Sequence, residues 1–137
     1  MQNSLVYVVD DEKIIALTLA LILRQSGFVT ISFTDPLEAL ERARSDAPDL
    51  LITDVVMPQL SGIDLAVQIR QICPQCKILL FSGQAATANL LEAASEKGHD
   101  FNVLTKPIHP KDLLQHIHTL AESPLPPAPP DILVGRA

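Results

Sequence analysis

Five short apolar runs, each followed by a segment of helical character, constrain the fold of this sequence more than any other feature. The runs are rich in Val, Ile and Leu and start 23, 21, 28 and 24 residues apart. Strands that alternate with helices in this way predict right-handed crossovers and a parallel sheet with helices on both faces, so we expect an α/β fold. The expected strands are Leu5–Val9, Phe28–Ser32, Asp49–Thr53, Lys77–Phe81 and Phe101–Thr105, and the expected helices are Lys13–Ser26, Pro36–Asp46, Ile63–Ile72, Ala86–Lys97 and Pro110–Glu122.

Residue types at three helix ends support these boundaries. Thr34 or Asp35 followed by Pro36 is typical of a helix N-cap with proline in the first turn. Gly27 and Gly98 stand where a helix would end in a left-handed residue. Both kinds of signal place helix ends between the apolar runs.

The composition is apolar enough to raise the question of a membrane span, because 47% of the residues are hydrophobic and the mean hydropathy is +0.26. The longest apolar stretch, Ile14–Leu23, has ten residues including Thr18, whereas a membrane-spanning helix needs about 20. No basic segment precedes an apolar core at the N-terminus, so we expect no secretion signal and a cytoplasmic location. Strands that are apolar on both faces account for the high hydrophobic content.

Acidic residues outnumber basic ones by 16 to 10, which gives a formal net charge of −6. Binding to nucleic acid or to anionic membranes depends on Lys and Arg, so we expect neither partner. The length of 137 residues suits one domain.

The composition changes abruptly after residue 122. Five of the 11 prolines fall between Pro124 and Pro130, a density that excludes helix and strand pairing. We expect a domain over residues 1–122 and a proline-rich tail or linker over residues 123–137. Whether the tail is a linker or a docking segment for a proline-recognising partner stays open here.

Polar side chains follow four of the apolar runs. Asp10 and Asp11 come after the first run, Asp54 after the third, Ser82 after the fourth and Lys106 after the fifth. Ligands of open α/β sheets bind at the carboxyl ends of the strands, so these side chains would meet if the strand order is 2-1-3-4-5. Converging carboxylates favour a cation, and oxygen ligands in a water-filled site suit Mg²⁺. A metal beside a carboxylate, a lysine and a hydroxyl is suited to phosphoryl transfer, with Asp54 as the nucleophile.

Four motifs at these positions stand in order along the chain. They are Asp10-Asp11, Asp54-Val55-Val56-Met57-Pro58 with Gly62, Ser82-Gly83 and Lys106-Pro107. Together they resemble the receiver domain of bacterial two-component response regulators, over Leu5 to about Ala121. The resemblance implies a flavodoxin-like (βα)5 doubly wound sandwich with a five-stranded parallel sheet in the order 2-1-3-4-5. It also implies a signalling switch that assists only its own phosphorylation and dephosphorylation, and not an enzyme with an external substrate.

The resemblance assigns a role to each motif residue. Asp54 would be the phosphoacceptor, taking a phosphoryl group from a phosphohistidine on a sensor histidine kinase or a histidine phosphotransfer protein. Asp11, Asp54 and the backbone carbonyl of Val56 would bind Mg²⁺ directly, and Asp10 would act largely through water. Lys106 would pair with the phosphoryl oxygens.

Phosphorylation would act through the rest of the domain. Ser82 would move to hydrogen-bond one phosphoryl oxygen, and the peptide bond before Pro107 would be cis. The charge added at Asp54 would reshape a face that binds a downstream protein target, and a homodimer through this face stays open. The face consists of helix Ala86–Lys97, strand Phe101–Thr105 and helix Pro110–Glu122.

The sequence departs from the family's pattern near this switch. The family carries Tyr or Phe three residues before the lysine, where this chain has Val103, and Phe101 lies two residues earlier. Either Phe101 substitutes from a shifted place or the switch lacks its rotating ring, so we expect a weakened or rewired output. Val56 and Gln84 flank the reaction centre, and we hypothesise that apolar Val56 positions water poorly and prolongs the life of the phosphoryl-aspartate.

Two other functions fit part of the sequence. A degenerate receiver, suggested by Val103, would bind a protein partner without phosphoryl chemistry. A haloacid-type phosphatase would also form an aspartyl phosphate, but it needs a second acid two residues after the nucleophile, where this chain has Val56.

Cysteine and histidine residues suggest redox chemistry or metal binding, and we expect neither. Cys73 and Cys76 form a CxxC, but the expected sheet places them opposite the aspartates, and no second pair completes a zinc site. We interpret them as loop thiols without function. The histidines are interpreted as surface residues, with only His109 near Lys106; they are His99, His109, His116 and His118.

Overall fold

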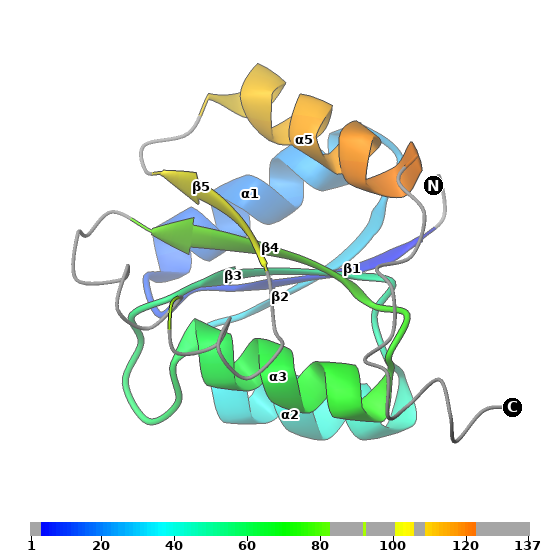
Figure 1. Ribbon diagram of the computed structural model, residues 1–137. Helices are drawn as coiled ribbons and strands as arrows, with labels where there is room; N and C mark the ends of the chain where they lie inside the picture. The colour runs from blue at the N-terminus through cyan, green and yellow to red at the C-terminus, as the bar shows by residue number, and fades with distance from the viewer. Residues whose placement is uncertain (1–3, 83–91, 93–100, 106–108, 123–137) are drawn as a thin grey trace, which may run out of the picture.

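The structure, a computed structural model, describes residues 4–82, 92, 101–105 and 109–122, in which a parallel sheet lies between two helical layers (Figure 1). The strand order is β2-β1-β3-β4-β5, so the predicted α/β class and order are confirmed. Helices α1 and α5 cover one face of the sheet, and α2 and α3 cover the other. The strands are β1 (Leu5–Val9), β2 (Val29–Phe33), β3 (Leu50–Asp54), β4 (Lys77–Ser82) and β5 (Asn102–Thr105), and the helices are α1 (Lys13–Gln25), α2 (Pro36–Ser45), α3 (Gly62–Ile72) and α5 (Pro110–Glu122).

Some predicted elements lie outside the described residues, namely the helix over Ala86–Lys97, its end at Gly98 and the tail over residues 123–137. Within the ranges that are described, no helix combines the length and the apolar character needed to cross a membrane.

Strands β2, β3 and β5 each begin one residue later than predicted. Phe28 belongs to the turn that follows α1, because its N–H donates to the carbonyl of Leu23 at 3.1 Å. Asp49 precedes β3, and its side chain accepts the N–H of Leu5 at 2.8 Å. At the other end of β3, the N–H of Val55 donates to the carbonyl of Phe81 at 3.0 Å, so the pairing with β4 continues past Asp54. The prediction was wrong by one residue because apolar character does not show which backbone N–H and C=O groups form hydrogen bonds outside the pairing of the strands.

The end of α1 confirms the left-handed residue predicted at Gly27, whose φ is 97°. Its N–H donates to the carbonyl of Arg24, and the next N–H, of Phe28, donates to the carbonyl of Leu23, both at 3.1 Å. This pair of bonds is the Schellman motif, which satisfies carbonyls that the helix leaves without partners. Phe28 and Leu23 are both buried in the same core cluster, so the motif also sets where β2 begins.

The N-cap of α2 is Asp35, whose side chain accepts the N–H of Leu37 at 2.9 Å. Of the two residues that the sequence allowed for this position, the structure therefore selects the aspartate over Thr34. Pro36 occupies the first turn, as predicted, where its missing N–H costs nothing.

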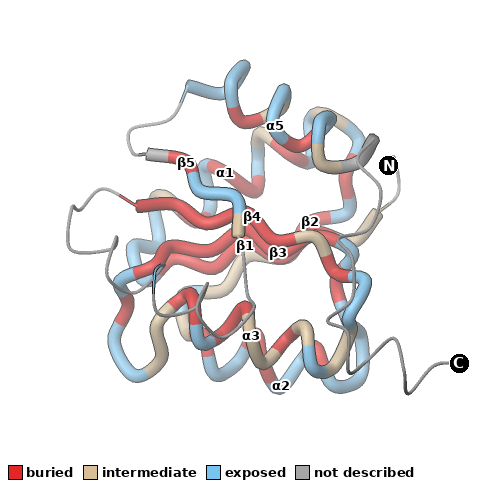
Figure 2. Tube along the Cα trace, viewed as in Figure 1, coloured by how far each residue is buried: buried red, intermediate tan, exposed pale blue. Residues whose placement is uncertain are grey.

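The central strands β1, β3 and β4 are buried on both faces, and Figure 2 shows them as the most buried part of the described chain, while the edge strands β2 and β5 are more exposed. Alternate residues of β1 join different core clusters. Val6 and Val8 face the α1 and α5 side, whereas Tyr7 and Val9 face the α2 and α3 side. Strands of this kind explain the high hydrophobic content without a membrane span.

Candidate functional site

Three carboxylates converge at the carboxyl end of the sheet. Ligand oxygens of Asp10, Asp11 and Asp54 lie within 4.8 Å of one another. Asp10 is fully buried, Asp54 is 8% exposed and Asp11 is exposed. The cluster forms because β1 and β3 are neighbours in the sheet, so that residues far apart in sequence end at the same edge.

Asp10 is held where the chain leaves β1 and turns into α1. Its N–H donates to the carbonyl of Phe33 at 3.1 Å, which extends the pairing with β2 by one residue. One of its carboxylate oxygens, Oδ1, accepts the N–H of Glu12 at 2.9 Å. These two bonds fix the main chain and the side chain of Asp10, so its charge keeps one place in the cluster.

Asp54 is the last residue of β3 and is hydrogen-bonded to both of its neighbours in the chain. Its Oδ1 accepts the N–H of Val55 at 3.0 Å, and its main-chain carbonyl accepts the hydroxyl of Thr53 at 2.9 Å. Thr53 is fully buried. The carboxylate therefore stands on a rigid strand end, at the edge where Asp10 and Asp11 also lie.

The hydroxyl residue predicted beside this cluster lies on the neighbouring strand. Asp54 pairs with Phe81 in the register of β3 and β4, so Ser82 stands one residue further towards the carboxyl edge. Ser82 is 8% exposed and pairs with Thr105 of β5. Lys106 and Pro107 follow directly in sequence and lie outside the described residues, as does Gln84.

Val56, whose carbonyl is a predicted metal ligand, lies two residues after Asp54 with its side chain 50% exposed. This apolar side chain is therefore in contact with solvent. The prediction that it influences hydrolysis stays a prediction.

Of the two residues predicted to take part in the switch, Val103 lies in β5 and Phe101 lies directly before it. Val103 is 36% exposed and pairs with Leu80, two residues before Ser82. Phe101 precedes β5 and packs against the core cluster on the α2 and α3 side. The guanidinium of Arg70 in α3 lies 5.1 Å from the centroid of the Phe101 ring, so this ring is engaged at the amino end of the strand.

Arg70 is itself in an unusual environment. Its Nε is buried and, among the described residues, has no hydrogen-bond partner. Burial lowers the pKa of the guanidinium from its usual value. Its contact with the ring of Phe101 is a cation–π interaction, which is stronger where water is excluded.

The carboxylate cluster fits a divalent metal ion that prefers oxygen ligands. Mg²⁺ takes only one or two protein carboxylates and keeps several waters. The exposed Asp11 gives water access, and the two buried carboxylates supply fixed oxygens. Three negative charges this close repel each other, and a bound cation would relieve the repulsion. The donor set therefore suits Mg²⁺ better than a metal that prefers sulfur or nitrogen.

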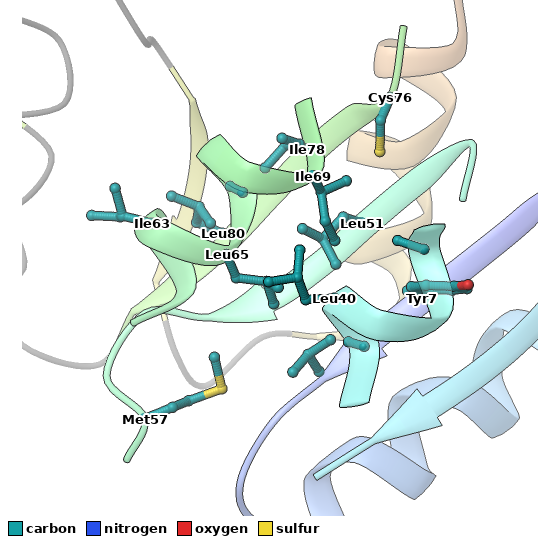
Figure 3. Packing of buried hydrophobic residues seen from close by; sticks show 14 of the residues in the cluster. Tyr7, Leu40, Leu51, Met57, Ile63, Leu65, Ile69, Cys76, Ile78 and Leu80 are labelled. Atoms are coloured by element: carbon teal, nitrogen blue, oxygen red, sulfur yellow. The ribbon is translucent and has the colours of Figure 1, made fainter. Parts of the chain in front are cut away.

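The CxxC lies at the opposite end of the sheet, between α3 and β4. Figure 3 shows Cys76 and Tyr7 at one end of the core cluster and Met57, in the loop after β3, at the other. Both cysteines are free. Burial, with a smaller effect of Cys73, raises the pKa of the Cys76 thiol to about 12, so it is almost entirely protonated near neutral pH and a poor nucleophile.

Tyr7 shares this environment. Its hydroxyl donates to the main-chain carbonyl of Asp46, and its ring packs on Phe33 with centroids 4.9 Å apart. Burial, with Asp46 adding to the effect, raises its pKa to about 12. These contacts are structural.

The described histidines lie on or beside α5. His116 and His118 are exposed, and Nδ1 of His109 accepts the N–H of Lys111 at 3.1 Å where the helix begins. In the part of the chain that the structure describes, none of them joins a group of three potential metal ligands. His99 lies outside those residues.

An apolar stripe on the outside of α1 was not predicted from the sequence. Ile14, Leu17 and Leu21 are 81%, 46% and 54% exposed, and their spacing places them on one side of the helix. The signal was present, because Ile14–Leu23 is apolar on all sides instead of along one face.

Comparison with known proteins gives one consistent family. A model of the response regulator receiver domain matches residues 6–118. The response regulator receiver protein CpdR of Brucella abortus is 37% identical over 72% of this chain and 80% of its own length. The chemotaxis protein CheY of Thermotoga maritima is 29% identical over 85% of this chain and 97% of its own length.

Longer regulators match as well. The transcriptional regulatory protein CreB of Escherichia coli is 32% identical over 88% of this chain, which spans about half, 52%, of CreB. Among solved structures, a response regulator receiver domain protein from Clostridium thermocellum has a TM-score of 0.75 at 28% identity, covering 85% of this chain and 93% of that one. The receiver domain of the Francisella response regulator 1452 has a TM-score of 0.73 at 29% identity, covering 86% and 96%.

Proposed function

This chain belongs to the response regulator receiver domain family, and from that premise we propose that Asp54 accepts a phosphoryl group in a Mg²⁺-dependent phosphorelay. Receiver domains are signalling switches, not enzymes that turn over an external substrate. The observation that carries the proposal is the convergence of Asp10, Asp11 and Asp54 at the carboxyl edge of the sheet.

In the proposed transfer, a carboxylate oxygen of Asp54 attacks the phosphorus of a phosphohistidine. The bond from phosphorus to the histidine nitrogen breaks, and the new bond makes an acyl phosphate on Asp54. The contacts of Asp54 with Val55 and Thr53 support this role, because they hold the nucleophile before the donor arrives.

Mg²⁺, when bound, would supply positive charge to the phosphoryl oxygens and reduce repulsion between these oxygens and the carboxylates. Asp11, Asp54 and the main-chain carbonyl of Val56 would hold it, and Asp10 would act through water. The burial of Asp10 and its bond to Glu12 support a role in fixing this arrangement.

Two further residues would act on the phosphoryl group. Ser82 would donate its hydroxyl to one oxygen, and its place on β4, one residue beyond the level of Asp54, supports that role. Lys106 would pair with another oxygen. It follows Thr105, which pairs with Ser82, so the register of β4 and β5 carries the chain towards the same edge.

The phosphodonor would be a histidine kinase or a histidine phosphotransfer protein, since receiver domains interact with such proteins. The stripe of Ile14, Leu17 and Leu21 supports a docking surface on α1. It begins three residues after Asp11, so it is continuous with the rim of the carboxylate cluster that the donor's histidine has to reach. Exposed apolar patches of this kind mark interaction sites.

The output would be a change in protein binding through the face that includes β5 and α5. Val103 on this face is 36% exposed and cannot supply a rotating ring. The ring of Phe101 is held against Arg70. These two observations support a rewired output over one that depends on an aromatic switch.

Intact mass spectrometry after incubation with acetyl phosphate tests the proposal. The native chain should gain one phosphoryl group with Mg²⁺ and far less when the metal is chelated, while Asp54→Asn should gain none. Absence of any adduct on the native chain would instead favour the alternative, a degenerate receiver that binds its partner without phosphoryl chemistry.

A further inference from the structure

The turn between α3 and β4 brings the two cysteines of the chain together. The N–H of Cys76 donates to the carbonyl of Cys73 at 3.1 Å, which closes a four-residue turn with Pro74 in its second position. Proline is favoured there because its φ is already fixed at the value that the turn needs. The Cα atoms at the two ends of such a turn lie less than about 7 Å apart, and a disulfide needs roughly 4.4–6.8 Å, so this spacing is compatible with a bridge.

Both cysteine side chains lie on the same side of the sheet. Cys76 is buried in the core cluster on the α2 and α3 side, and Cys73 packs against that cluster. Burial is the largest cause of the raised pKa of Cys76, and the neighbouring Cys73 is the second, which places the two thiols near each other. Both thiols are free. The pair therefore has the spacing and the orientation that a bridge requires.

Main-chain hydrogen bonds hold the turn at both ends. Cys73 is the C-cap of α3, and its N–H donates to the carbonyl of Ile69 at 2.7 Å. Directly after Cys76, the N–H of Lys77 donates to the carbonyl of Asp49 at 2.9 Å, where β4 begins. Because both ends are fixed, the thiols lose little further conformational entropy when they meet, and a bridge within the turn is favoured over bridges to other molecules.

The two thiols differ in their access to solvent. Cys73 is partly exposed, whereas Cys76 is 2% exposed and its Sγ donates to the carbonyl of Lys77 at 3.3 Å. An oxidant in solution therefore meets Cys73 first. Burial raises the pKa of Cys76, and the nearby guanidinium of Arg70 opposes this effect. That positive charge favours the thiolate that Cys76 has to form when it attacks from within the turn.

We propose that Cys73 and Cys76 are a redox modification site, which a low-molecular-weight disulfide converts to an intramolecular disulfide. The Cys73 thiolate attacks one sulfur of the oxidant, which forms a mixed disulfide and releases one thiolate. Cys76 then gives up its proton and attacks the sulfur of Cys73, so that the second thiolate leaves. The two leaving thiolates take up the protons that the cysteines have lost. Two protein thiols are thus oxidised, and the oxidant is reduced to two thiols.

The turn supports a different interpretation of the CxxC from the one made on the sequence alone, where the cysteines are loop thiols without function. Neither thiol has to be a strong nucleophile towards other molecules, because the second step takes place within one turn at a high effective concentration. The site lies at the amino end of β4, and Asp54 lies at the carboxyl end of the neighbouring β3. The inference is therefore independent of the proposed phosphoryl transfer.

Equilibration with reduced and oxidised glutathione tests the proposal. When the oxidised form is in excess, the native chain should lose two hydrogen atoms by intact mass spectrometry and should take up no iodoacetamide in urea. Dithiothreitol should restore both iodoacetamide labels. A native chain that keeps two free thiols at every glutathione ratio, or that ends as a mixed disulfide with glutathione, would overturn the inference.

Single-cysteine variants separate the two steps. Cys76→Ala should stop at a mixed disulfide of Cys73 with glutathione, because the second thiol is missing. Cys73→Ala should react with oxidised glutathione about tenfold more slowly than Cys76→Ala, because its remaining thiol is buried and protonated. Equal rates in the two variants would overturn the proposed order of attack.

Thermal melts show whether the native fold holds the thiols at bridging distance. If it does, the bridge stabilises the folded chain relative to the unfolded one. Oxidised native protein should therefore melt about 5 °C higher than reduced native protein. Cys73→Ala, treated in the same way, is the matched control and should show no shift. An equal or lower melting temperature after oxidation of the native chain would mean that the turn has to distort to form the bridge, which would overturn the inference.

Discussion

At the scale of single residues, burial and charge determine which groups can react. Asp10 and Asp54, at exposures of 0% and 8%, each accept a backbone N–H at a carboxylate oxygen. Cys76 is equally buried, at 2%, and burial raises the pKa of its thiol to about 12, so the thiol stays protonated near neutral pH. The same degree of burial thus accompanies hydrogen-bonded carboxyl groups at one end of the sheet and a protonated thiol at the other.

The repulsion among the three carboxylates predicts an effect of Asp11→Asn on stability. Without Mg²⁺, the variant should melt about 2 °C higher than native protein, because one of three neighbouring negative charges is removed. With saturating Mg²⁺ the order should reverse, since native protein gains binding energy that the variant has lost. Thermal melts at both conditions check this.

Asp112→Asn is the matched control for charge, because Asp112 is exposed on α5 and lies outside the cluster. It should respond to Mg²⁺ as native protein does. A Mg²⁺-dependent rise in melting temperature of the same size in Asp11→Asn would contradict the assignment of Asp11 as a ligand.

The raised pKa of Cys76 predicts a loss of stability at alkaline pH. The folded chain keeps the thiol protonated up to about pH 12, whereas the unfolded chain releases the proton near the usual value of 9.0. The unfolded state therefore binds fewer protons above pH 9, and stability falls as pH rises. Between pH 8 and pH 10, this one group should cost about 1 kcal/mol of unfolding free energy.

Urea unfolding of native protein and Cys76→Ala at the two pH values checks this prediction. The variant should lose less stability between pH 8 and pH 10, whatever its stability at pH 8, and Cys73→Ala serves as the control. Tyr7 also titrates differently in the folded and unfolded chain, but Cys76 is the smallest of the causes that raise its pKa to about 12, so its contribution changes little among the three proteins. Identical pH slopes in native protein and Cys76→Ala would show that the thiol titrates alike in both states.

At the scale of secondary-structure elements, α1 has two different apolar faces. Its inner face packs on the sheet, and its outer face exposes Ile14, Leu17 and Leu21. Exposed apolar groups do not stabilise the isolated domain, and their presence on the helix that starts beside Asp11 supports the proposed docking surface.

Leu17→Ser tests this surface of α1. With a phosphorylated histidine kinase domain as donor, labelling should slow about tenfold relative to labelling by acetyl phosphate, because only the protein donor contacts the helix. Leu37→Ser is the matched control, since Leu37 is 47% exposed on α2, in the other helical layer. An unchanged ratio of the two rates in Leu17→Ser would remove α1 from the donor surface.

At the scale of the whole molecule, the order of strands creates the site. With β1 and β3 adjacent, the ends of both strands bring their aspartates to one edge, and β4 adds Ser82, which pairs with Thr105 of β5. The alternation of strands and helices could be predicted from the sequence, because buried parallel strands are apolar throughout. The strand order came from the resemblance of the motifs.

Other features could not be predicted because they depend on contacts between distant residues. Nothing in the sequence around Gln59 indicates a positive φ, and only the packed loop between β3 and α3 reveals how closely Gly62 approaches Asp54. The contact of Phe101 with Arg70 likewise joins the residue before β5 to α3. Apolar periodicity predicts which elements form, and it carries no information about such pairs.

The central claim is that Asp54, among three neighbouring aspartates, is the residue that carries the phosphoryl group. Borohydride reduction after labelling with acetyl phosphate and Mg²⁺ tests it directly, because an acyl phosphate is reduced to an alcohol and the aspartate becomes homoserine. Peptide sequencing by mass spectrometry should locate homoserine at position 54 alone. Homoserine at position 10 or 11, or at none of the three positions, would contradict the account.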